Sequence, residues 1–300
     1  MNLHNKVIYT HGSCPICSSP IKRWRSKVVV TIQYHIDRCT ICDFAFVNPR
    51  PSIEYLMDFY SKSGHQISTE KLTDNATLAS ITATERKYPN ATIDASRIIK
   101  TVRGLLKTTR QQESFLDVGC GYGFFSKAAI DNGFNVTPLE LAKSEREIAA
   151  KMLGISPLES SFEEIDLLPS SFTVLLMSQI LEHALDVNQW IEKAHFLLEP
   201  GGIIAIALPN FGSLFRICLN EKESYITPPA HLNYFNPGNL SLLLEKHGFK
   251  VEAVQWVSRI PTRTFEKRLP NIAKPLLPVI NSLSKIVLKG FDILHLGMIY

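Results

Sequence analysis

Short apolar runs alternate with helix-like patterns through the second half of the chain. The runs lie at 115–118, 134–139, 172–177 and 203–208. Most are nearly continuous in apolar residues, which is typical of strands buried on both faces of a parallel sheet. Helical patterns lie at Phe124–Asp131 and Trp190–Leu198, and Glu199–Gly202 is expected to end the second of them in a turn. The order of elements predicts a doubly wound α/β sheet over residues 111–300, with another strand at Ile155–Leu158.

Two regions precede this sheet. Residues 51–110 are predicted to form a helical cap or linker, with helices at Ser52–Tyr60 and Ile93–Leu106. Residues 1–50 contain the β-branched run Val28–Ile32, which is typical of a hairpin strand. We therefore expect a small N-terminal module, a helical connection and one larger α/β domain.

Composition narrows the class of protein without choosing a function. With 45% hydrophobic and 20% charged residues in 300, the chain is typical of a globular protein with a large core. The net charge of +4 is too small to indicate nucleic-acid binding by itself. The first ten residues lack the basic-then-apolar pattern of a secretory signal, and no uncharged apolar stretch reaches the roughly 18 residues that span a bilayer. We therefore expect a cytoplasmic protein, in which thiols stay reduced.

Three glycines at alternate positions follow the first strand. Gly119, Gly121 and Gly123 permit a sharp turn and let a ligand approach main-chain N–H groups at the start of a helix. The dinucleotide pattern G-x-G-x-x-G would need glycine at position 124, which is Phe124. Glu140 ends the second strand, where a carboxylate can accept hydrogen bonds from both hydroxyls of a ribose. The alternative is that Glu140 is an ordinary surface side chain at a strand end.

Asp117 followed by these glycines resembles the first motif of the class I S-adenosylmethionine-dependent methyltransferases. Leu181–His183, a helix, Pro200–Gly202, a strand and Leu208–Asn210 then follow in the order found in a large group of these enzymes. That group includes quinone-biosynthesis O-methyltransferases and many sugar and natural-product methyltransferases. The resemblance covers residues 112–258 and implies a Rossmann-like sheet of seven strands that binds S-adenosylmethionine.

The resemblance also implies which residues hold the cofactor. They are the glycine loop with its acidic neighbours and the residues expected at the two ends of the cofactor: Asp117, Gly119, Gly121, Gly123, Glu140, Ser161, Phe162, Ser178 and Gln179. Phe162 is expected to stack on the adenine. Ser178 and Gln179 are expected to contact the methionine end.

Two histidines are candidates for a general base or a contact to the methyl acceptor. His183 follows the fourth strand, at the carboxyl edge where doubly wound sheets bind ligands. His231 lies on a segment that is expected to close over the pocket. The alternatives are a histidine that caps the next helix or braces the cofactor loop, for His183, and a loop histidine bonded to backbone, for His231. In quinone O-methyltransferases a Glu-x-x-Glu-His run can hold a divalent ion, but Gln179 replaces the first carboxylate here, so no catalytic metal is expected.

Four of the six cysteines form two C-x-x-C pairs, Cys14 with Cys17 and Cys39 with Cys42. This spacing matches a structural zinc site in which each pair holds one side of a tetrahedral ion. The alternatives are disulfides or a redox pair. Because cysteines fill all four positions, no ligand position is left for water, and we expect the zinc ion to be structural and the module to be a zinc ribbon.

Two basic segments bear on the partners of the protein. Lys22, Arg23, Arg25 and Lys27 surround Trp24 in the zinc-ribbon module, but one small basic cluster is more often a solvated face, so nucleic acid is an unlikely partner. Residues 260–290 are predicted to form a basic helical insertion before a last strand. The insertion is expected to pack on the domain or on a second subunit of a homodimer, or else to contact the inner face of a membrane.

The expected activity is therefore methyl transfer from S-adenosylmethionine to a hydroxyl. The acceptor is expected to be a sugar, in a surface polysaccharide or a lipid-linked saccharide, or another small metabolite. Within enzymes, C- or N-methylation in secondary metabolism and methylation of a quinol-type phenol are alternatives. Outside enzymes, the alternative is a non-catalytic regulator that binds the cofactor and docks on a partner through its zinc ribbon.

Overall fold

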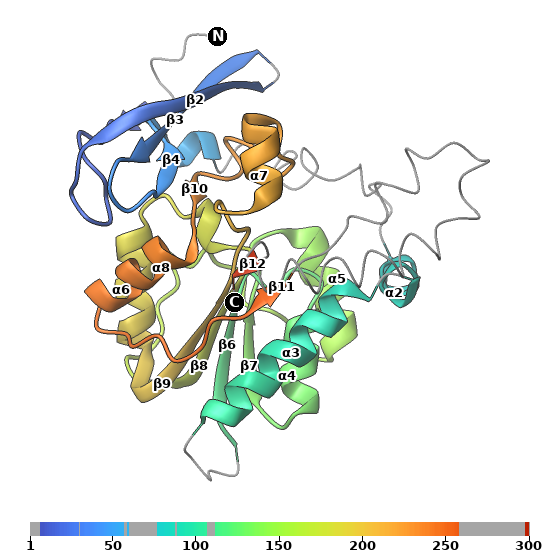
Figure 1. Cartoon of the computed structure of the whole chain (residues 1–300). Coiled ribbons are helices and arrows are strands. Elements are labelled where there is room, and N and C mark those ends of the chain that lie inside the picture. The colour runs from blue at the N-terminus through green and yellow to red at the C-terminus, as the bar shows by residue number, and fades with distance from the viewer. Residues whose placement is uncertain are drawn as a thin grey trace.

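The computed structural model of the chain describes residues 7–29, 31–56, 59, 77–87, 89–106, 112–257 and 298–299. Its centre is a parallel sheet of four strands: β6 (Ser114–Val118), β7 (Asn135–Leu139), β8 (Phe172–Ser178) and β9 (Leu198–Ala207). The strands lie in the order β7-β6-β8-β9, and each neighbouring pair is parallel (Figure 1). The chain passes from β6 to β7 on one side and later to β8 on the other, so the strand order reverses at β6. This reversal is the switch point at which doubly wound sheets bind ligands.

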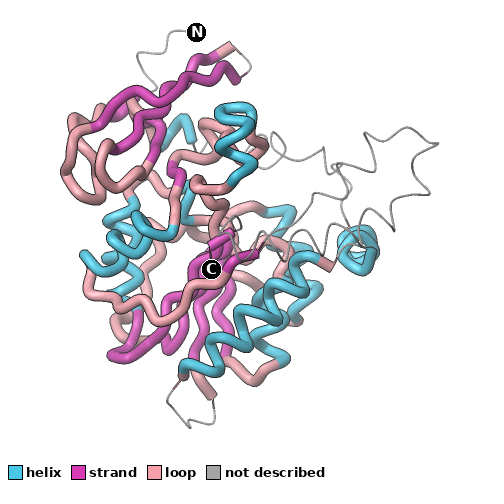
Figure 2. The backbone as a smooth tube through the Cα atoms, in the orientation of Figure 1, coloured by secondary structure: helices cyan, strands magenta, loops and turns pink. Residues whose placement is uncertain are grey.

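Helices cover both faces of this sheet (Figure 2). One face carries α3 (Asn90–Leu105) and α4 (Phe124–Asp131), and the other carries α6 (Val187–Leu197) and α8 (Pro237–Lys246). Successive strand residues point to opposite faces: Phe115 packs with the first pair of helices and Leu116 with the second. The strands read as continuous apolar runs because both of their faces are buried.

The other described helices are shorter or lie outside these layers. They are α2 (Leu78–Lys87), α5 (Lys143–Leu153), the 3-10 turns η2 (Leu181–His183) and η3 (Asn220–Lys222), and α7 (Leu214–Leu219). Residues 53–56, within the helix predicted for Ser52–Tyr60, are helical. Within the described part of the chain, no helix is both long and apolar enough to cross a bilayer.

Most predicted elements of the α/β domain are confirmed. Helix α4 has the predicted bounds. The helix predicted at Ile93–Leu106 in the cap or linker corresponds to α3, which packs on a face of the sheet. The strand predicted at Ile155–Leu158 is wrong, because only Leu158 pairs, in an isolated parallel bridge with Leu139. Pro157 stands immediately before Leu158 and lacks the N–H group that a strand in a sheet would donate.

The turn predicted at Glu199–Gly202 is also wrong, since strand β9 begins directly after α6 and runs through these residues. Phe172 pairs with Leu198, whereas Val174 pairs with Ile203, so the extra residues of β9 form a bulge. Gly201 has a φ of +80° within this bulge, a conformation that glycine adopts without a steric penalty. The Pro-Gly-Gly segment therefore bends a strand instead of preceding it.

A central sheet of seven strands is not seen in the described residues, where this sheet has four. Strands β11 (Trp256–Val257) and β12 (Met298–Ile299) form a separate antiparallel pair, and β12 contacts β9. The predicted insertion at 260–290 lies outside the described residues, as does most of the predicted last strand. The count of seven stays a prediction.

The predicted N-terminal hairpin is present and is longer than expected. Strands β2 (Ile21–Val29) and β3 (Ile32–Cys39) pair in antiparallel fashion, and β4 (Ala45–Val47) pairs with β3. The fourth strand of this sheet is β10 (Asn233–Tyr234). It follows β9 in the sequence and so belongs to the part of the chain that forms the α/β domain. A short ladder between β1 (Val7–Tyr9) and β5 (Arg50–Pro51) flanks it. The N-terminal module and the α/β domain therefore share a sheet.

Aromatic side chains fill the boundary between the module and the domain. Phe44 and Phe46 are fully buried and stack with ring centroids 5.5 Å apart. Phe44 also contacts Phe235, with centroids 4.9 Å apart, and these rings belong to the same apolar cluster as Leu240 and Leu243 of α8. The module is thus packed against α8 and the segment that precedes it.

Candidate functional site

The glycine loop after β6 adopts the conformation that its composition predicts. Gly119, Gly121 and Gly123 have φ values of +67°, +54° and +90°, all in the left-handed region. A Cβ atom at position 119 would lie 2.8 Å from Cδ1 of Ile180, so this position also requires glycine for close packing. Helix α4 begins directly after Gly123, and the loop therefore brings backbone N–H groups to the start of a helix.

The carboxylate of Glu140 is held at the edge of the sheet by backbone groups. It follows the last residue of β7, where its Oε2 accepts a hydrogen bond from the Gly121 N–H at 2.8 Å. Its Oε1 accepts one from the Ala142 N–H, also at 2.8 Å. Only 8% of Glu140 is exposed. The structure therefore brings together the predicted ribose acceptor and the predicted glycine loop.

Asp117 connects the strand before the glycine loop to the helix after it. Its side chain is buried, and its Oδ2 accepts a hydrogen bond of 2.6 Å from the Ser126 hydroxyl of α4. Burial raises the pKa of the Asp117 carboxyl to about 6, while the hydrogen bond from Ser126 acts in the opposite direction. Asp117 therefore ties β6 to α4 and sets the shape of the loop.

Phe162 does not fit the predicted stacking on adenine. The side chain is 2% exposed, and its ring packs against the ring of Trp190 with centroids 5.2 Å apart. No exposed ring face is left for a base to cover. Ser161 lies beside it and is partly exposed, and its hydroxyl accepts a hydrogen bond from the Glu164 N–H at 3.2 Å. Of the two residues, only Ser161 is accessible to a ligand.

Ser178 and Gln179 stand at the carboxyl end of β8, beside the glycine loop. Gln179 has a φ of +57°, so the chain turns sharply there. Both its backbone N–H and its side-chain amide donate to the carbonyl oxygen of Ala207, at 2.8 and 3.2 Å. The Gln179 amide is thus engaged with the neighbouring strand β9.

The two predicted histidines meet although they are distant in sequence. Their rings lie 4.9 Å apart at an interplanar angle of 82°. Nδ1 of His183 bonds to the carbonyl oxygen of Ala230 at 2.7 Å, and Nδ1 of His231 bonds to that of Tyr225 at 2.6 Å. A carbonyl oxygen only accepts, so Nδ1 carries the hydrogen in both rings. The remaining nitrogen, Nε2, is then the basic atom of each ring.

Glu182 joins this pair and was missed by the prediction. It is 2% exposed, and neither of its carboxylate oxygens has a hydrogen-bond partner within the described part of the chain. Burial raises the pKa of the Glu182 carboxyl to about 8. One ligand atom from each of Glu182, His183 and His231 lies within 4.8 Å of the others, a spacing that could hold a cation. The sequence signal for Glu182 was its place as the second carboxylate of the Glu-x-x-Glu-His pattern, in which Gln179 replaces the first.

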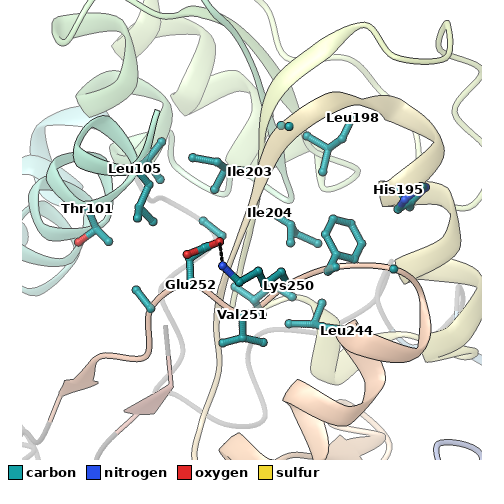
Figure 3. Close-up of a pocket in the computed structure, with 18 of the residues that line it drawn as sticks. Thr101, Leu105, His195, Leu198, Ile203, Ile204, Leu244, Lys250, Val251 and Glu252 are labelled. Carbon is teal, nitrogen blue, oxygen red and sulfur yellow. Dashed lines mark hydrogen bonds and ion pairs between the residues drawn. The ribbon is translucent and has the colours of Figure 1, made fainter. Parts of the chain in front are cut away.

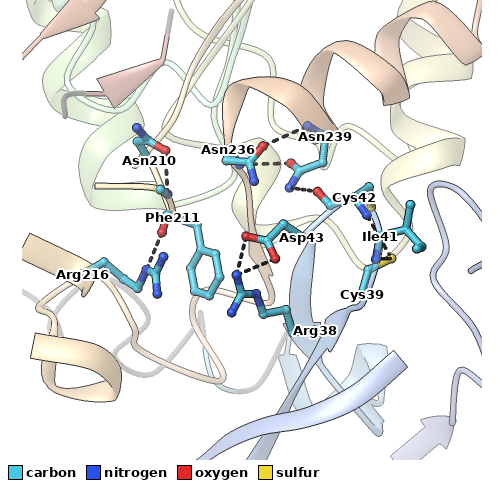
Figure 4. A network of polar contacts seen from close by, with 11 residues as sticks. Arg38, Cys39, Ile41, Cys42, Asp43, Asn210, Phe211, Arg216, Asn236 and Asn239 are labelled. Carbon is cyan, nitrogen blue, oxygen red and sulfur yellow. Dashed lines mark hydrogen bonds and ion pairs between the residues drawn. The ribbon is translucent and has the colours of Figure 1, made fainter. Parts of the chain in front are cut away.

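The four N-terminal cysteines also converge. The Sγ atoms of Cys14 and Cys42 are 3.6 Å apart, those of Cys17 and Cys39 are 3.5 Å apart, and all four lie within 4.8 Å of one another. All four thiols are free, so no disulfide competes for them. Backbone N–H groups of Ile41 and Cys42 point to the sulfur of Cys39 at 3.4 Å (Figure 4). Such N–H groups stabilise a thiolate, which is the form that binds zinc.

A groove in the described part of the chain lies away from these residues. It has a volume of about 780 Å³ and runs along β9, between α3, α8 and residues 250–255. Figure 3 shows the apolar side chains of Ile203, Ile204 and Leu244 in it, with the Lys250–Glu252 ion pair at its rim. None of the predicted cofactor or acceptor residues lines this groove.

The basic residues of β2 are largely engaged with the rest of the molecule. Arg23 pairs with Asp37, Arg25 pairs with Glu221 at 3.2 Å, and Lys27 donates to the carbonyl oxygen of Ile226. The first contact lies within the hairpin, and the other two tie the hairpin to residues that follow α7. That nucleic acid is not a partner stays a prediction.

Residues 91–254 match the model of a protein family described as a methyltransferase domain. The chain belongs to that family. The family match, the parallel sheet and the glycine loop together identify the chain as a member of the class I S-adenosylmethionine-dependent methyltransferases. The prediction made from Asp117, the three glycines and the Leu-Glu-His segment is therefore confirmed.

Two curated relatives are similar to part of this chain. A probable S-adenosylmethionine-dependent methyltransferase of Mycolicibacterium smegmatis is 27% identical over 138 residues, which cover 46% of this chain and 52% of the relative. A ubiquinone biosynthesis O-methyltransferase of Colwellia psychrerythraea is 30% identical over 151 residues, which cover 45% of this chain and 60% of the relative. The chain thus spans little more than half the length of these relatives.

Among solved structures, an S-adenosylmethionine-dependent methyltransferase from Archaeoglobus fulgidus aligns with 67% of this chain and 90% of its own. The TM-score is 0.49 and the sequence identity is 17%.

We predict that Glu140→Ala weakens the binding of S-adenosylhomocysteine by roughly 1.5–3 kcal/mol, the range for hydrogen bonds to a charged group. The substitution removes the carboxylate that Gly121 and Ala142 hold in place. Isothermal titration calorimetry measures the change. Glu147→Ala, on the exposed face of α5, is the matched control and should bind like the wild type. Equal affinity of Glu140→Ala and the wild type would contradict the assignment.

We predict that Glu182→Gln changes the pH dependence of stability. Because burial raises the Glu182 pKa from 4.5 to about 8, the folded protein keeps a proton that the unfolded chain loses in this range. The wild type should therefore lose stability as pH rises from 4.5 to about 8, relative to a variant that cannot titrate. Urea unfolding across this range tests it, with the exposed Glu192→Gln as control. Parallel stability profiles for Glu182→Gln and the wild type would contradict it.

Proposed function

We propose that this protein transfers a methyl group from S-adenosylmethionine to a hydroxyl of a sugar or another small metabolite. One observation carries the proposal: the glycine loop, Glu140 and His183 follow neighbouring strands at one edge of the sheet, and the ring of His231 lies against that of His183. An arrangement of this kind can hold a ribose on one side and a reacting hydroxyl on the other. The names of relatives that methylate an oxygen during ubiquinone biosynthesis support an oxygen acceptor.

The residues of the glycine loop fit the cofactor. Glycines with positive φ leave the loop open on the ligand side, and the positive end of α4 points to it. Glu140 would accept hydrogen bonds from the ribose hydroxyls, and Asp117 would hold the loop through Ser126. Ser161 would lie at the adenine end, and Ser178 and the backbone of Gln179 at the methionine end.

The cofactor, when bound, supplies a methyl group on a sulfonium that is ready for in-line transfer. The protein must then orient the acceptor and take the proton from its hydroxyl. His183 is suited to this task because the Ala230 carbonyl fixes its Nδ1 hydrogen and leaves Nε2 as the basic nitrogen. His231 is held in the same way by Tyr225 and would contact the acceptor or replace His183 as the base.

We predict that His183→Ala lowers the turnover of S-adenosylmethionine by about 10²–10⁴-fold, the usual contribution of a general base. Its affinity for S-adenosylhomocysteine should stay close to that of the wild type, because His183 does not belong to the glycine loop. The assay follows release of S-adenosylhomocysteine in the presence of a metabolite extract. His35→Ala, on the β2–β3 hairpin, is the control. Loss of cofactor binding in His183→Ala would make this residue structural, and full activity would leave no role for it as a base.

We further propose that Cys14, Cys17, Cys39 and Cys42 bind one structural zinc ion. The separations of 3.5 and 3.6 Å between sulfurs suit thiolates around a tetrahedral ion with zinc–sulfur bonds of about 2.3 Å. Cysteine sulfurs would fill every position, so the ion would stabilise the fold without activating water. It would define the module of residues 1–50 as a zinc ribbon, followed by a helical connection over 51–110 and the methyltransferase domain over 111–300.

We predict one zinc ion per chain in protein purified without added metal. Mass spectrometry of the metal content measures the stoichiometry. Replacing Cys39 and Cys42 together by serine should abolish it, because two of the four ligands are lost. Cys218→Ser is the matched control, since Cys218 is an exposed thiol outside the cluster. Absence of zinc in the wild type, or zinc retained in the double variant, would refute the site.

A further inference from the structure

A buried arginine links the N-terminal module to the segment that carries His231. Arg50, at the start of β5, is 1% exposed. Its Nη1 donates to the Leu232 carbonyl oxygen at 3.0 Å, and its Nη2 donates to Oδ1 of Asn233 at 2.6 Å. Among the described side chains, no carboxylate forms an ion pair with it. The guanidinium also lies over the Phe46 ring, 5.5 Å from its centroid, and interacts with the Tyr9 side chain. Burying a cation without an ion-pair partner costs free energy, and these contacts offset part of that cost.

Asn233 continues the link into the turn that carries His183. Its Nδ2 faces three backbone carbonyl oxygens of this turn, those of Ala184 at 2.7 Å, Leu181 at 3.3 Å and Glu182 at 3.4 Å. The Leu232 N–H donates to the Glu182 carbonyl oxygen at 2.8 Å as well. Asn233 is 2% exposed, so water cannot replace these contacts.

The same short segment is anchored to the N-terminal sheet by its backbone. Asn233 pairs with Phe46 in the β10–β4 ladder. The carbonyl oxygen of Leu232 accepts from the Val47 N–H at 2.9 Å as well as from Arg50. The position of His231, two residues before Asn233, is therefore set by the N-terminal sheet. The turn of His183 is held relative to it by the Asn233 amide, the Leu232 N–H and the bond from His183 Nδ1 to the Ala230 carbonyl oxygen.

We propose that Arg50 and Asn233 are positioning residues of the acceptor site, through which the N-terminal module sets the spacing of His183 and His231. This inference rests on the proposed methyl transfer. Arg50 orients the Asn233 amide by holding its oxygen, so that the amide nitrogen points at the turn. The amide nitrogen then holds the turn in register with the loop of His231. The N-terminal module therefore helps to position the residues that contact the methyl acceptor.

Substitutions at Arg50 distinguish a positioning role from ordinary packing. If Arg50 only filled space, the uncharged Arg50→Met would be neutral or stabilising, because a buried charge would be removed. If it orients Asn233, Arg50→Met should impair turnover even where the protein is as stable as the wild type. Arg50→Lys keeps the charge but loses the planar fork that reaches two acceptors, so it should restore only part of the turnover.

Asn233→Asp is the most direct test, because it replaces only the side-chain NH2 group by an oxygen atom. The new carboxylate can still accept from Arg50, but it can no longer donate to the three carbonyl oxygens of the turn. Asn236→Asp is the matched control three residues further on. Among the described residues, the Asn236 side chain bonds only through Oδ1, the acceptor that caps α8, and aspartate supplies the same acceptor.

The experiment has one readout that requires no methyl acceptor and two that follow the reaction. Proton titration of the imidazoles of His183 and His231 by NMR reports their surroundings directly. We expect shifted midpoints in Asn233→Asp and Arg50→Met, and wild-type midpoints in Asn236→Asp. We also expect turnover to fall by about 10- to 100-fold in Asn233→Asp, the scale of a misplacement of about 1 Å. Affinity for S-adenosylhomocysteine should be unchanged in all three variants.

Two results would overturn the proposal. One is wild-type titration and turnover in both Asn233→Asp and Arg50→Met. The other is a loss of stability that accounts for all of the lost turnover, shown by full recovery at low temperature. If Asn233→Asp fails to fold, Arg50→Met and Arg50→Lys decide the question alone. A wild type without any turnover would refute the proposed function, whereas the histidine titrations would still test the positioning.

Discussion

The antiparallel pairing of β4 with β10 connects the two halves of this molecule. Two backbone pairs, Asn233 with Phe46 and Tyr234 with Ala45, join the N-terminal sheet to the methyltransferase domain. The aromatic rings of Phe44 and Phe235 pack beside this ladder, and the amide of Asn239 donates to the Cys42 carbonyl oxygen at 3.2 Å (Figure 4). The cysteine cluster, the first turn of α8 and the loop of His231 are therefore fixed relative to one another.

The candidate site follows from this connection and from the parallel sheet. The sheet alone brings the glycine loop and Glu140 together, because β6 and β7 are neighbours and end at the same edge. It also places His183 near them, after β8. It does not supply His231, which arrives on the segment that leads into β10. The cofactor half of the site is thus a property of the α/β fold, while the acceptor half depends on both parts of the chain.

The sequence predicted the elements whose signals are local. The glycines at 119, 121 and 123 and helix α4 are confirmed, since a loop that needs positive φ requires glycine. The failures involve distant partners or backbone chemistry. Phe162 was assigned to adenine from the resemblance, and the sequence did not reveal that Trp190, on a later helix, buries its ring. The strand predicted at 155–158 does not form beyond one bridge at Leu158, because Pro157 lacks the N–H group that a strand would donate. The contact between Arg50 and Asn233 joins residues 183 positions apart, and no local sequence pattern predicts it.

The most direct test of this arrangement is a crystal structure of the protein with S-adenosylhomocysteine. We predict that the ribose hydroxyls bind Glu140 and that the homocysteine sulfur faces the side of the site where His183 and His231 meet. The N-terminal sheet should keep its contact with β10 in that complex. A molecule bound elsewhere, such as in the groove along β9, or a sulfur that faces away from both histidines, would contradict it.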